Sequence, residues 1–299
     1  MQLKILTEAS GSLTAGYLIH AIKNAGHVCI ASDIDDSCFG RFVADDFIHM
    51  PQANTDHLWN IIEAEILSKK IDIVIPSLDE TLLGWAERKQ LFKDLGVHVI
   101  ISEPTTIAVC QDKWLTYQFF KEQGVPTPNT SLEQNYPLIK PRLGRGSTGI
   151  KITKTHVNMQ GKISQQIIKG IEYTVDVFCD QNCNPVYIVP RRRISVKDGK
   201  STAGIVEKND IISYWIKHIC KKLNFIGPIN FQCFMLPDQS IYFLEINPRI
   251  AGGMALGFAA TENWVDLIIN NIIFGIPIKP KTIKYGLKMK RYYAEVFVP

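Results

Sequence analysis

Short apolar runs alternate with longer amphipathic stretches over the first hundred residues of the chain. The runs predict strands at Leu3–Thr7, Val28–Ala31, Phe47–Met50, Ile71–Pro76 and Val97–Ile101. The amphipathic stretches predict helices at Thr14–Asn24, Thr55–Lys69 and Thr81–Phe92. Short apolar strands separated by helices are typical of a parallel sheet that is covered on both faces. We therefore expect an α/β, Rossmann-like domain over about residues 1–105.

The pattern changes after Pro104, where a helix at Asp112–Gln123 is followed mainly by strands. These are predicted at Leu138–Lys140, Ile150–Thr153, Ser164–Ile168, Ile171–Phe178 and Val186–Val189, and, after a helix at about Asp210–Leu223, at Ile229–Met235 and Ile241–Ile246. This pattern of many strands and few helices favours an α+β domain over residues 106–299, and its charged residues lie on the strands.

Composition and charge exclude several classes of protein. Apolar residues make up 46% of the 299 residues, which is enough for the cores of about two domains. The net charge of +4 is far from that of a dedicated nucleic-acid binder, and none of the seven cysteines forms a CxxC pair. We therefore expect no nucleic-acid partner, no disulfide framework and no zinc site.

The two ends of the chain carry no sign of a membrane or secretion segment. The most apolar late stretch, Trp264–Ile278, contains Asp266, Asn270 and Asn271, which favours a packed helix. Leu3–Thr7 leads into a Gly/Ser loop and lacks the regions of a secretory signal. We expect a soluble, cytoplasmic protein without a membrane partner.

The loops that follow the predicted parallel strands are the first candidates for ligand binding. Ligands of such sheets bind at the carboxyl ends of the strands, here at Ser10–Ser12, Asp33–Asp35 and Ser77–Glu80. The first loop lacks GxGxxG spacing, so a nicotinamide dinucleotide is not expected. Asp79 and Glu80 suit a substrate ammonium group. The alternative is that they only charge the first turn of the following helix.

A glycine-rich segment, Lys140-Pro-Arg-Leu-Gly-Arg-Gly-Ser-Thr-Gly149, lies between two predicted strands. Small residues with free N–H groups can fold over a polyphosphate, and Lys140 and Arg145 supply positive charge. The segment is not a Walker A loop, because no Gly-Lys-Ser/Thr opens a helix after it. A hairpin with solvated basic residues explains it equally well.

Oxygen-bearing side chains gather on two neighbouring strands near the end of the chain. Period-two alternation places Glu245 and Asn247 on one face of their strand, with Gln232 expected opposite them. Such an all-oxygen set suits a Mg²⁺ ion that bridges nucleotide phosphates. Arg249 lies one step further along and can hold an anionic intermediate. A solvated edge strand is the alternative, and the apolar run before Glu245 disfavours it.

Two further segments carry weaker signals. The extended stretch from Gln165 to Tyr173 can offer backbone groups to an adenine edge, and Glu172 can accept hydrogen bonds from ribose hydroxyls, although an ordinary hairpin looks the same. In Arg191-Arg192-Arg193, the first and third residues share one face of a strand. We favour Arg193, before a predicted turn at Ser201–Gly204, as a carboxylate or phosphate contact; solvated surface arginines are an equal alternative.

Together and in this order, these segments resemble the ATP-grasp superfamily over essentially the whole chain. The resemblance is greatest to the branch with the carbamoyl phosphate synthetase large subunit, biotin carboxylase and the PylC-type amino-acid ligases. It implies an ATP-grasp fold: a Rossmann-like pre-ATP-grasp domain to about residue 105, then a small subdomain at about 112–168 and a large one at about 169–299.

The resemblance also implies roles for individual residues. Those that would bind ATP are Lys113, Lys140, Gly146, Ser147, Thr148, Gln166, Ile167, Ile168 and Glu172. Those that would bind metal are Gln232, Glu245 and Asn247, and those with catalytic roles are Arg249 and Lys140. Arg193 is a further catalytic candidate, from its place on the strand and not from the resemblance. Many relatives have an acid at the position of Gln232, which implies that one Mg²⁺ site is weak. The stretch between Thr153 and Ser164 is also shorter than in the family.

The implied activity is that of an ATP-dependent carboxylate–amine ligase that acts through an acyl phosphate and releases ADP and phosphate. ATP and Mg²⁺, with Mn²⁺ as a substitute, are the expected cofactors. The expected partners are a small carboxylate or amino acid and an amine, and a homodimer stays open. One alternative is carbamoyl phosphate synthetase-like carboxyphosphate chemistry with a separate partner chain. Another is a non-catalytic ATP-binding regulatory protein.

Overall fold

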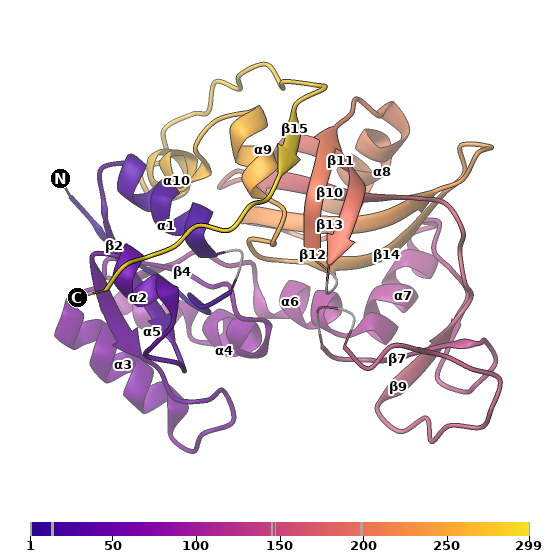
Figure 1. Cartoon of the computed structure of the whole chain (residues 1–299), viewed down its shortest axis with the longest axis horizontal. Helices are drawn as coiled ribbons and strands as arrows, with labels where there is room; N and C mark the ends of the chain where they lie inside the picture. Colours follow the sequence, from indigo (N-terminus) through magenta and orange to yellow (C-terminus); the bar gives the residue numbers. More distant parts are fainter. Residues whose placement is uncertain (1, 13–14, 145, 147, 198–199, 299) are drawn as a thin grey trace.

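Three β-sheets organise the chain in the computed structural model, which describes residues 2–12, 15–144, 146, 148–197 and 200–298 (Figure 1). A five-stranded sheet has the order β3-β2-β1-β4-β5, a four-stranded sheet the order β6-β9-β7-β8, and a six-stranded sheet the order β14-β13-β10-β11-β12-β15. The mixed α/β class expected from the sequence is confirmed, with a parallel sheet in the N-terminal part and antiparallel sheets after it.

The first sheet is parallel throughout. Its strands are β1 (Lys4–Thr7), β2 (Val28–Asp33), β3 (Asp46–His49), β4 (Ile73–Ile75) and β5 (His98–Val99). The helices around it are α1 (Ala15–Asn24), α2 (Phe39–Val43), α3 (Leu58–Lys69), α4 (Leu82–Glu87) and α5 (Lys89–Asp94), with a 3₁₀ turn η1 at Asp79–Thr81. The single helix predicted at Thr81–Phe92 is therefore wrong: it is broken at Arg88, whose backbone leaves the helical region.

The strand order of the first sheet reverses between β1 and β4. The chain leaves these neighbouring strands in opposite directions, which opens a crevice at their carboxyl ends. Glu8 spans this point, since its carboxylate accepts hydrogen bonds from Ser77 N (3.1 Å), Thr81 Oγ1 (2.9 Å) and Trp85 Nε1 (2.9 Å). Burial raises the pKa of Glu8, and these donors oppose that rise. The loops after β1 and β4 are thus fixed to each other.

The four-stranded sheet comes next and contains β6 (Thr130–Ser131), β7 (Leu138–Pro141), β8 (Lys151–Ile152) and β9 (Lys162–Gln165). Two helices precede it, α6 (Pro104–Gln111) and α7 (Lys113–Glu122). The pattern analysis does not predict α6. Pro104 occupies its first turn, where a proline favours helix initiation because no backbone N–H is needed there.

The six-stranded sheet is antiparallel and contains β10 (Ile171–Cys179), β11 (Pro185–Lys197), β12 (Lys200–Val206), β13 (Gly227–Met235), β14 (Ile241–Asn247) and β15 (Lys288–Lys290). The long helix α8 (Asp210–Cys220) packs against β11. The turn predicted at Ser201–Gly204 is wrong, because these residues pair with β11 as part of β12. Strand β11 also extends well past the predicted Val189, and acids neutralise its arginines, as described below.

The last helices join the first and third sheets in one core. They are α9 (Ala255–Ala260), α10 (Trp264–Leu267) and the π-helical η2 (Ile268–Ile273), so the helix predicted at Trp264–Ile278 is real but ends at Ile273. The buried Trp264 packs in the same apolar cluster as Ile5 of β1, Ile19 of α1 and Tyr187 of β11. No helix in the described ranges is long and apolar enough to span a membrane.

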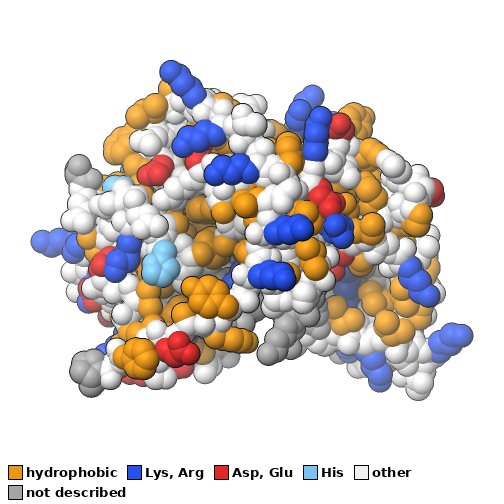
Figure 2. All heavy atoms as spheres, turned by 45° about the horizontal axis from the view of Figure 1, so that its top comes forward, with side chains coloured by type: hydrophobic (Ala, Val, Ile, Leu, Met, Phe, Trp, Pro, Cys, Tyr) orange, Lys and Arg blue, Asp and Glu red, His pale blue; other side chains and the backbone are white. Residues whose placement is uncertain are grey.

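Charged side chains do not form a single basic patch on the face shown in Figure 2. Lys and Arg are scattered there among apolar and uncharged atoms on both halves of the molecule. This distribution agrees with the small net charge of +4 and differs from the continuous basic stripe of nucleic-acid binders.

Candidate active site

A cavity of about 350 Å³ lies between the four-stranded and six-stranded sheets. The structure brings most predicted site residues together on its walls: Lys113, Lys140, Gly146, Thr148, Gln166, Ile167, Ile168, Glu172, Arg193, Gln232 and Glu245. Ser147 and Arg145 lie outside the described residues. Asn247 lines two adjoining cavities of about 160 and 290 Å³, and Arg249 lines the smaller of these. Both share Glu245 with the cavity of about 350 Å³.

The two predicted phosphate-binding lysines come from β7 and the start of α7. Lys140 is almost completely buried, and burial lowers its pKa to about 8, although the nearby Glu245 opposes the change. Lys113 donates from Nζ to the carbonyl of Gly144 (2.7 Å), which places it beside the glycine-rich loop. Asp112 holds this end of α7 by accepting from Trp114 N (2.8 Å) and by pairing with Arg142. Both ammonium groups thus converge on one wall.

The predicted adenine and ribose contacts line the same cavity. The predicted strand Ser164–Ile168 ends at Gln165, because Gln166 leaves β9 and donates from its backbone N–H to the carbonyl of Asn129 (2.8 Å). Glu172 lies on β10 and forms an ion pair with Arg193 of β11, whose side chain is only 7% exposed. The predicted ribose acid and the predicted catalytic arginine are therefore direct neighbours in this structure.

The three predicted metal ligands form a compact set of oxygen donors. Gln232 of β13 pairs with Glu245 of β14 in the sheet register, and Asn247 lies two residues further on. Asn247 Nδ2 donates to Glu245 Oε1 (3.2 Å), so the amide and the carboxylate adjoin. Among the described residues, no group of three or more His, Cys, Asp or Glu could hold a metal ion. One carboxylate with two amides instead fits a Mg²⁺ ion that takes its remaining ligands from phosphates and water.

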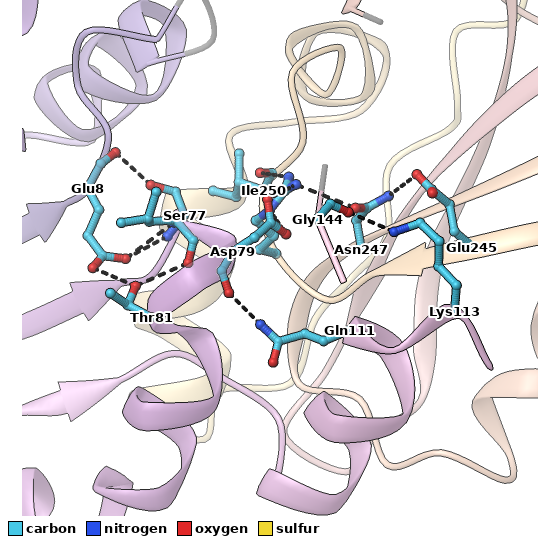
Figure 3. A network of polar contacts seen from close by, with 12 residues as sticks. Glu8, Ser77, Asp79, Thr81, Gln111, Lys113, Gly144, Glu245, Asn247 and Ile250 are labelled. Atoms are coloured by element: carbon cyan, nitrogen blue, oxygen red, sulfur yellow. Dashed lines mark hydrogen bonds and ion pairs between the residues drawn. The ribbon is translucent and has the colours of Figure 1, made fainter. Parts of the chain in front are cut away.

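Arg249 makes a contact that the sequence does not reveal. Its Nε and Nη2 donate to the two carboxylate oxygens of Asp79 at 2.9 and 2.5 Å. Figure 3 shows this region: Arg249 contacts both Asp79 and Asn247, and Asn247 contacts Glu245. The contacts of Glu8 with Ser77 and Thr81 form a separate group nearby. Asp79 belongs to η1, at the carboxyl end of the first sheet, and lies 170 residues from Arg249 in the chain. Asp79 and Glu80 thus lie in the first turn of η1, as the alternative expects, and the Asp79 carboxylate pairs with Arg249.

The cavity of about 160 Å³ is lined by three arginines: Arg191, Arg193 and Arg249. Arg191 is 1% exposed and pairs with the buried Asp176 at 2.5 and 2.8 Å, while its Nη1 has no hydrogen-bond partner among the residues that the structure describes. A Cβ atom at Gly253 would lie only 2.5 Å from that Nη1, so a larger residue there would displace the buried guanidinium. Sequence reasoning missed Asp176, although an acid inside the apolar run Ile171–Phe178 is a signal for a buried ion pair. Because three guanidinium groups line it, the cavity of about 160 Å³ suits an anion.

Comparison with known proteins agrees with this geometry. Residues 110–253 match the ATP-grasp domain family. The chain is 27% identical over 271 residues to a D-alanine–D-alanine ligase of Petrotoga mobilis, covering 79% of this chain and 82% of the relative. It is 23% identical over 222 residues to a carbamoyl-phosphate synthase of Methanobrevibacter smithii, covering 62% and 59%.

Two solved structures have the same fold. The biotin carboxylase domain of the Hydrogenobacter thermophilus 2-oxoglutarate carboxylase, in complex with MgADP, ADP and bicarbonate, has a TM-score of 0.73 at 16% identity, covering 96% of this chain and 73% of that one. The L-amino acid ligase from Bacillus licheniformis has a TM-score of 0.70 at 14% identity, covering 94% and 75%.

Fold and site together define the class: an ATP-grasp domain preceded by a Rossmann-like parallel sheet. The resemblance drawn from the sequence is confirmed: residues 110–253 are an ATP-grasp domain, and the similar proteins include a D-alanine–D-alanine ligase and a carbamoyl-phosphate synthase.

Proposed function

We propose that the protein is an ATP-dependent ligase that activates a carboxylate as an acyl phosphate and transfers the acyl group to an amine. The observation that carries this proposal is the placement of Lys113, Lys140 and Glu245 on one cavity that adjoins a cavity lined by three arginines. The first cavity suits a nucleotide polyphosphate and the second an anion that receives its terminal phosphoryl group.

In the proposed reaction, a carboxylate oxygen attacks the γ-phosphorus of ATP, and the bond to the β,γ-bridging oxygen breaks to release ADP. The amine nitrogen then attacks the acyl carbon, the C–O bond to phosphate breaks, and the nitrogen loses a proton. Positioning and charge neutralisation dominate such phosphoryl transfers. The chain supplies both through the lysines and arginines of the two cavities.

For the nucleotide, adenine would lie at Gln166–Ile168, the ribose hydroxyls at Glu172 and the phosphates at Lys113 and Lys140. Gly146 and Thr148 would cover the phosphates and exclude water, which would otherwise hydrolyse the acyl phosphate. These assignments follow the proposed division into a pre-ATP-grasp domain over 1–105 and an ATP-grasp domain over 106–299, with subdomains at about 112–168 and 169–299.

Gln232, Glu245 and Asn247 would hold Mg²⁺, which when bound neutralises phosphate charge. Arg249 and Arg193 would bind the reacting carboxylate. A well-placed donor to the developing oxyanion is worth about 3 kcal/mol, and Arg249 is our candidate for that donor. Asp79 keeps the Arg249 guanidinium in place through two hydrogen bonds.

Hydroxylamine trapping tests this proposal directly. Carboxylates and amino acids are supplied one at a time with ATP, Mg²⁺ and hydroxylamine, and acyl hydroxamate and nucleotide products are measured. We expect hydroxamate, ADP and phosphate with at least one class of carboxylate. AMP and pyrophosphate among the products would contradict the mechanism.

Carboxyphosphate chemistry is the second candidate, and the similarity to a carbamoyl-phosphate synthase favours it. In that case bicarbonate would be the carboxylate that is phosphorylated. Bicarbonate alone would then stimulate ADP release, and no organic acid would yield a hydroxamate. The same assay therefore separates the two candidates.

A further inference from the structure

A separate cavity of about 490 Å³ lies at the carboxyl edge of the first sheet. It is distinct from the cavity of about 350 Å³ that we propose for the nucleotide (the nucleotide cavity). It is built on the loops that follow β1, β2, β3 and β4 and on the first half of α3. Its volume is that of small-molecule sites, and the carboxyl edge of an open α/β sheet at a reversal of strand order is where such ligands bind.

The walls of this cavity are apolar on one side and acidic on the other. Met50 after β3, together with Leu58 and Ile62 of α3, makes the apolar side, next to the edge strand of the sheet. Asp33 at the end of β2 and Glu80 in η1 supply carboxylates. Among the described residues that line the cavity there is no Lys, Arg or His. A ligand that fits it combines a positive charge with an apolar body.

The acidic side adjoins the proposed reaction centre. Glu80 also lines the cavity of about 290 Å³ beside Asn247. Ser12 also lines the cavity of about 160 Å³ with its three arginines (the arginine cavity). Asp33 accepts a hydrogen bond from Gly11 N (2.7 Å), so it lies against the same loop as Ser12. A cation held at these carboxylates would therefore lie at the border between the acidic cavity and the cavity that suits an anion.

Resting on the proposed ligase function, we infer that this cavity binds the amine substrate, a primary amine with an apolar body. Its ammonium group lies at Asp33 and Glu80, and its body points toward Met50 and α3. The nitrogen thus faces the acyl group in the arginine cavity, and the carboxylates favour the entry of the protonated amine. Apolar α-amino acids and simple apolar amines share this chemistry.

Titration calorimetry of the full chain tests the inference with defined probes. We expect phenethylamine to bind at least about tenfold more tightly than ethylamine, which lacks the apolar body, and than 3-phenylpropionate, which has the opposite charge. Phenylalanine is included to distinguish an α-amino acid from a simple amine as the natural ligand. Tighter binding of phenylalanine points to an amino acid, and tighter binding of phenethylamine points to a simple amine. Equal binding of 3-phenylpropionate and phenethylamine would overturn the inference.

Two pairs of variants locate the binding. Ala53 is half-buried on the cavity wall, so the substitution Ala53→Phe fills the cavity. Ala64→Phe, on the exposed side of α3 and outside the cavity lining, is its control. We expect the first to weaken phenethylamine binding about tenfold and the second to leave it unchanged. Ile34, at the mouth and 53% exposed, tolerates charge: Ile34→Lys should weaken binding about fivefold, whereas Ile34→Glu should not. Equal effects within either pair would contradict the inference.

The titrations contain neither ATP nor a carboxylate, so they do not depend on ligase chemistry. If the proposed function fails, the hydroxylamine assay yields no acyl hydroxamate while amine binding keeps its pattern. If the amine site fails, hydroxamate still forms while the probes show no preference. The two failures are therefore distinguishable.

Discussion

At the scale of single residues, Glu245 is the side chain on which turnover at the proposed nucleotide cavity should depend most. It is the one acid in the proposed metal set and also lines all three adjoining cavities. A ligand that positions charge in the transition state affects turnover more than ground-state binding.

We therefore expect Glu245→Gln to lower kcat by roughly 100-fold or more while leaving nucleotide affinity within a few fold, because the lysines and the adenine contacts stay in place. Steady-state kinetics and MgADP titration measure the two quantities. Glu122→Gln, an exposed residue at the end of α7, is the control and should behave as the parent. Near-normal turnover of the Glu245 variant would show that this carboxylate is not a metal ligand.

Lys140 predicts a stability effect with a defined pH dependence. Its pKa is lowered from 10.5 to about 8 in the folded protein. Below pH 8 both the folded and the unfolded chain carry the proton, so the cost of burying the charge is fully present. Between about pH 8 and pH 10.5 the unfolded chain binds more protons, so stability rises with pH in this window.

In metal-free and nucleotide-free buffer, Lys140→Met should therefore be about 3 kcal/mol more stable than the parent at pH 7. The difference should shrink toward zero as the pH approaches 10.5. Urea denaturation of both proteins at several pH values measures it. A difference that does not change with pH would mean that burial of the charge is not the cause.

At the scale of elements, η1 connects the first sheet to the end of β14, the strand that carries two of the three proposed metal ligands. Asp79 reaches Arg249 after β14, and Gln111 at the end of α6 donates to the backbone carbonyl of Asp79. Asp79 of η1 thus holds the Arg249 guanidinium, and Gln111 of α6 in turn holds Asp79.

Asp79→Asn should release Arg249 and lower kcat by roughly 10- to 100-fold with little change in the KM for ATP, because Arg249 is proposed to act on the acyl group and not on the nucleotide. Asp79→Glu should recover part of the loss. A purely structural role predicts a lower melting temperature with unchanged kcat, and that result would remove Asp79 from the mechanism.

Elements whose signal is local could be predicted from the sequence. The apolar run Ile71–Pro76 contains β4, and the alternation through Glu245 and Asn247 predicts their shared position beside Gln232. The signal fails where a distant partner decides the structure. The Ser-Thr-Ala-Gly stretch of β12 has turn composition but pairs with β11.

Charge pairs formed across the sheet are equally invisible in the sequence. The arginines on β11 are neutralised by Asp176, Glu207 and Glu172. Asp176 and Glu172 lie within the predicted strand Ile171–Phe178, but the sequence does not show which arginine each acid pairs with, and Glu207 lies in no predicted strand. The Asp79–Arg249 pair bridges 170 residues, and no local spacing encodes such a distance.

For the whole molecule, the cores argue against two independently stable halves. Strand β1 contributes Ile5 to a cluster that also contains Tyr187 and Trp264, and Leu6 to a second cluster with Phe92. The first cluster joins the parallel sheet to the six-stranded sheet. The second cluster is confined to the first 107 residues of the chain.

Trp264 is fully buried in the shared cluster, where it stacks on Tyr187 with ring centroids 6.4 Å apart. Trp264→Ala should cost about 3–5 kcal/mol, and because the cluster is shared it should loosen both sheets together. Phe92→Ala, of similar burial in the second cluster, should loosen only the first sheet. Hydrogen–deuterium exchange read separately in β1 and β10 distinguishes the two. If Trp264→Ala accelerates exchange in β10 but not in β1, the sheets are energetically independent despite their shared core.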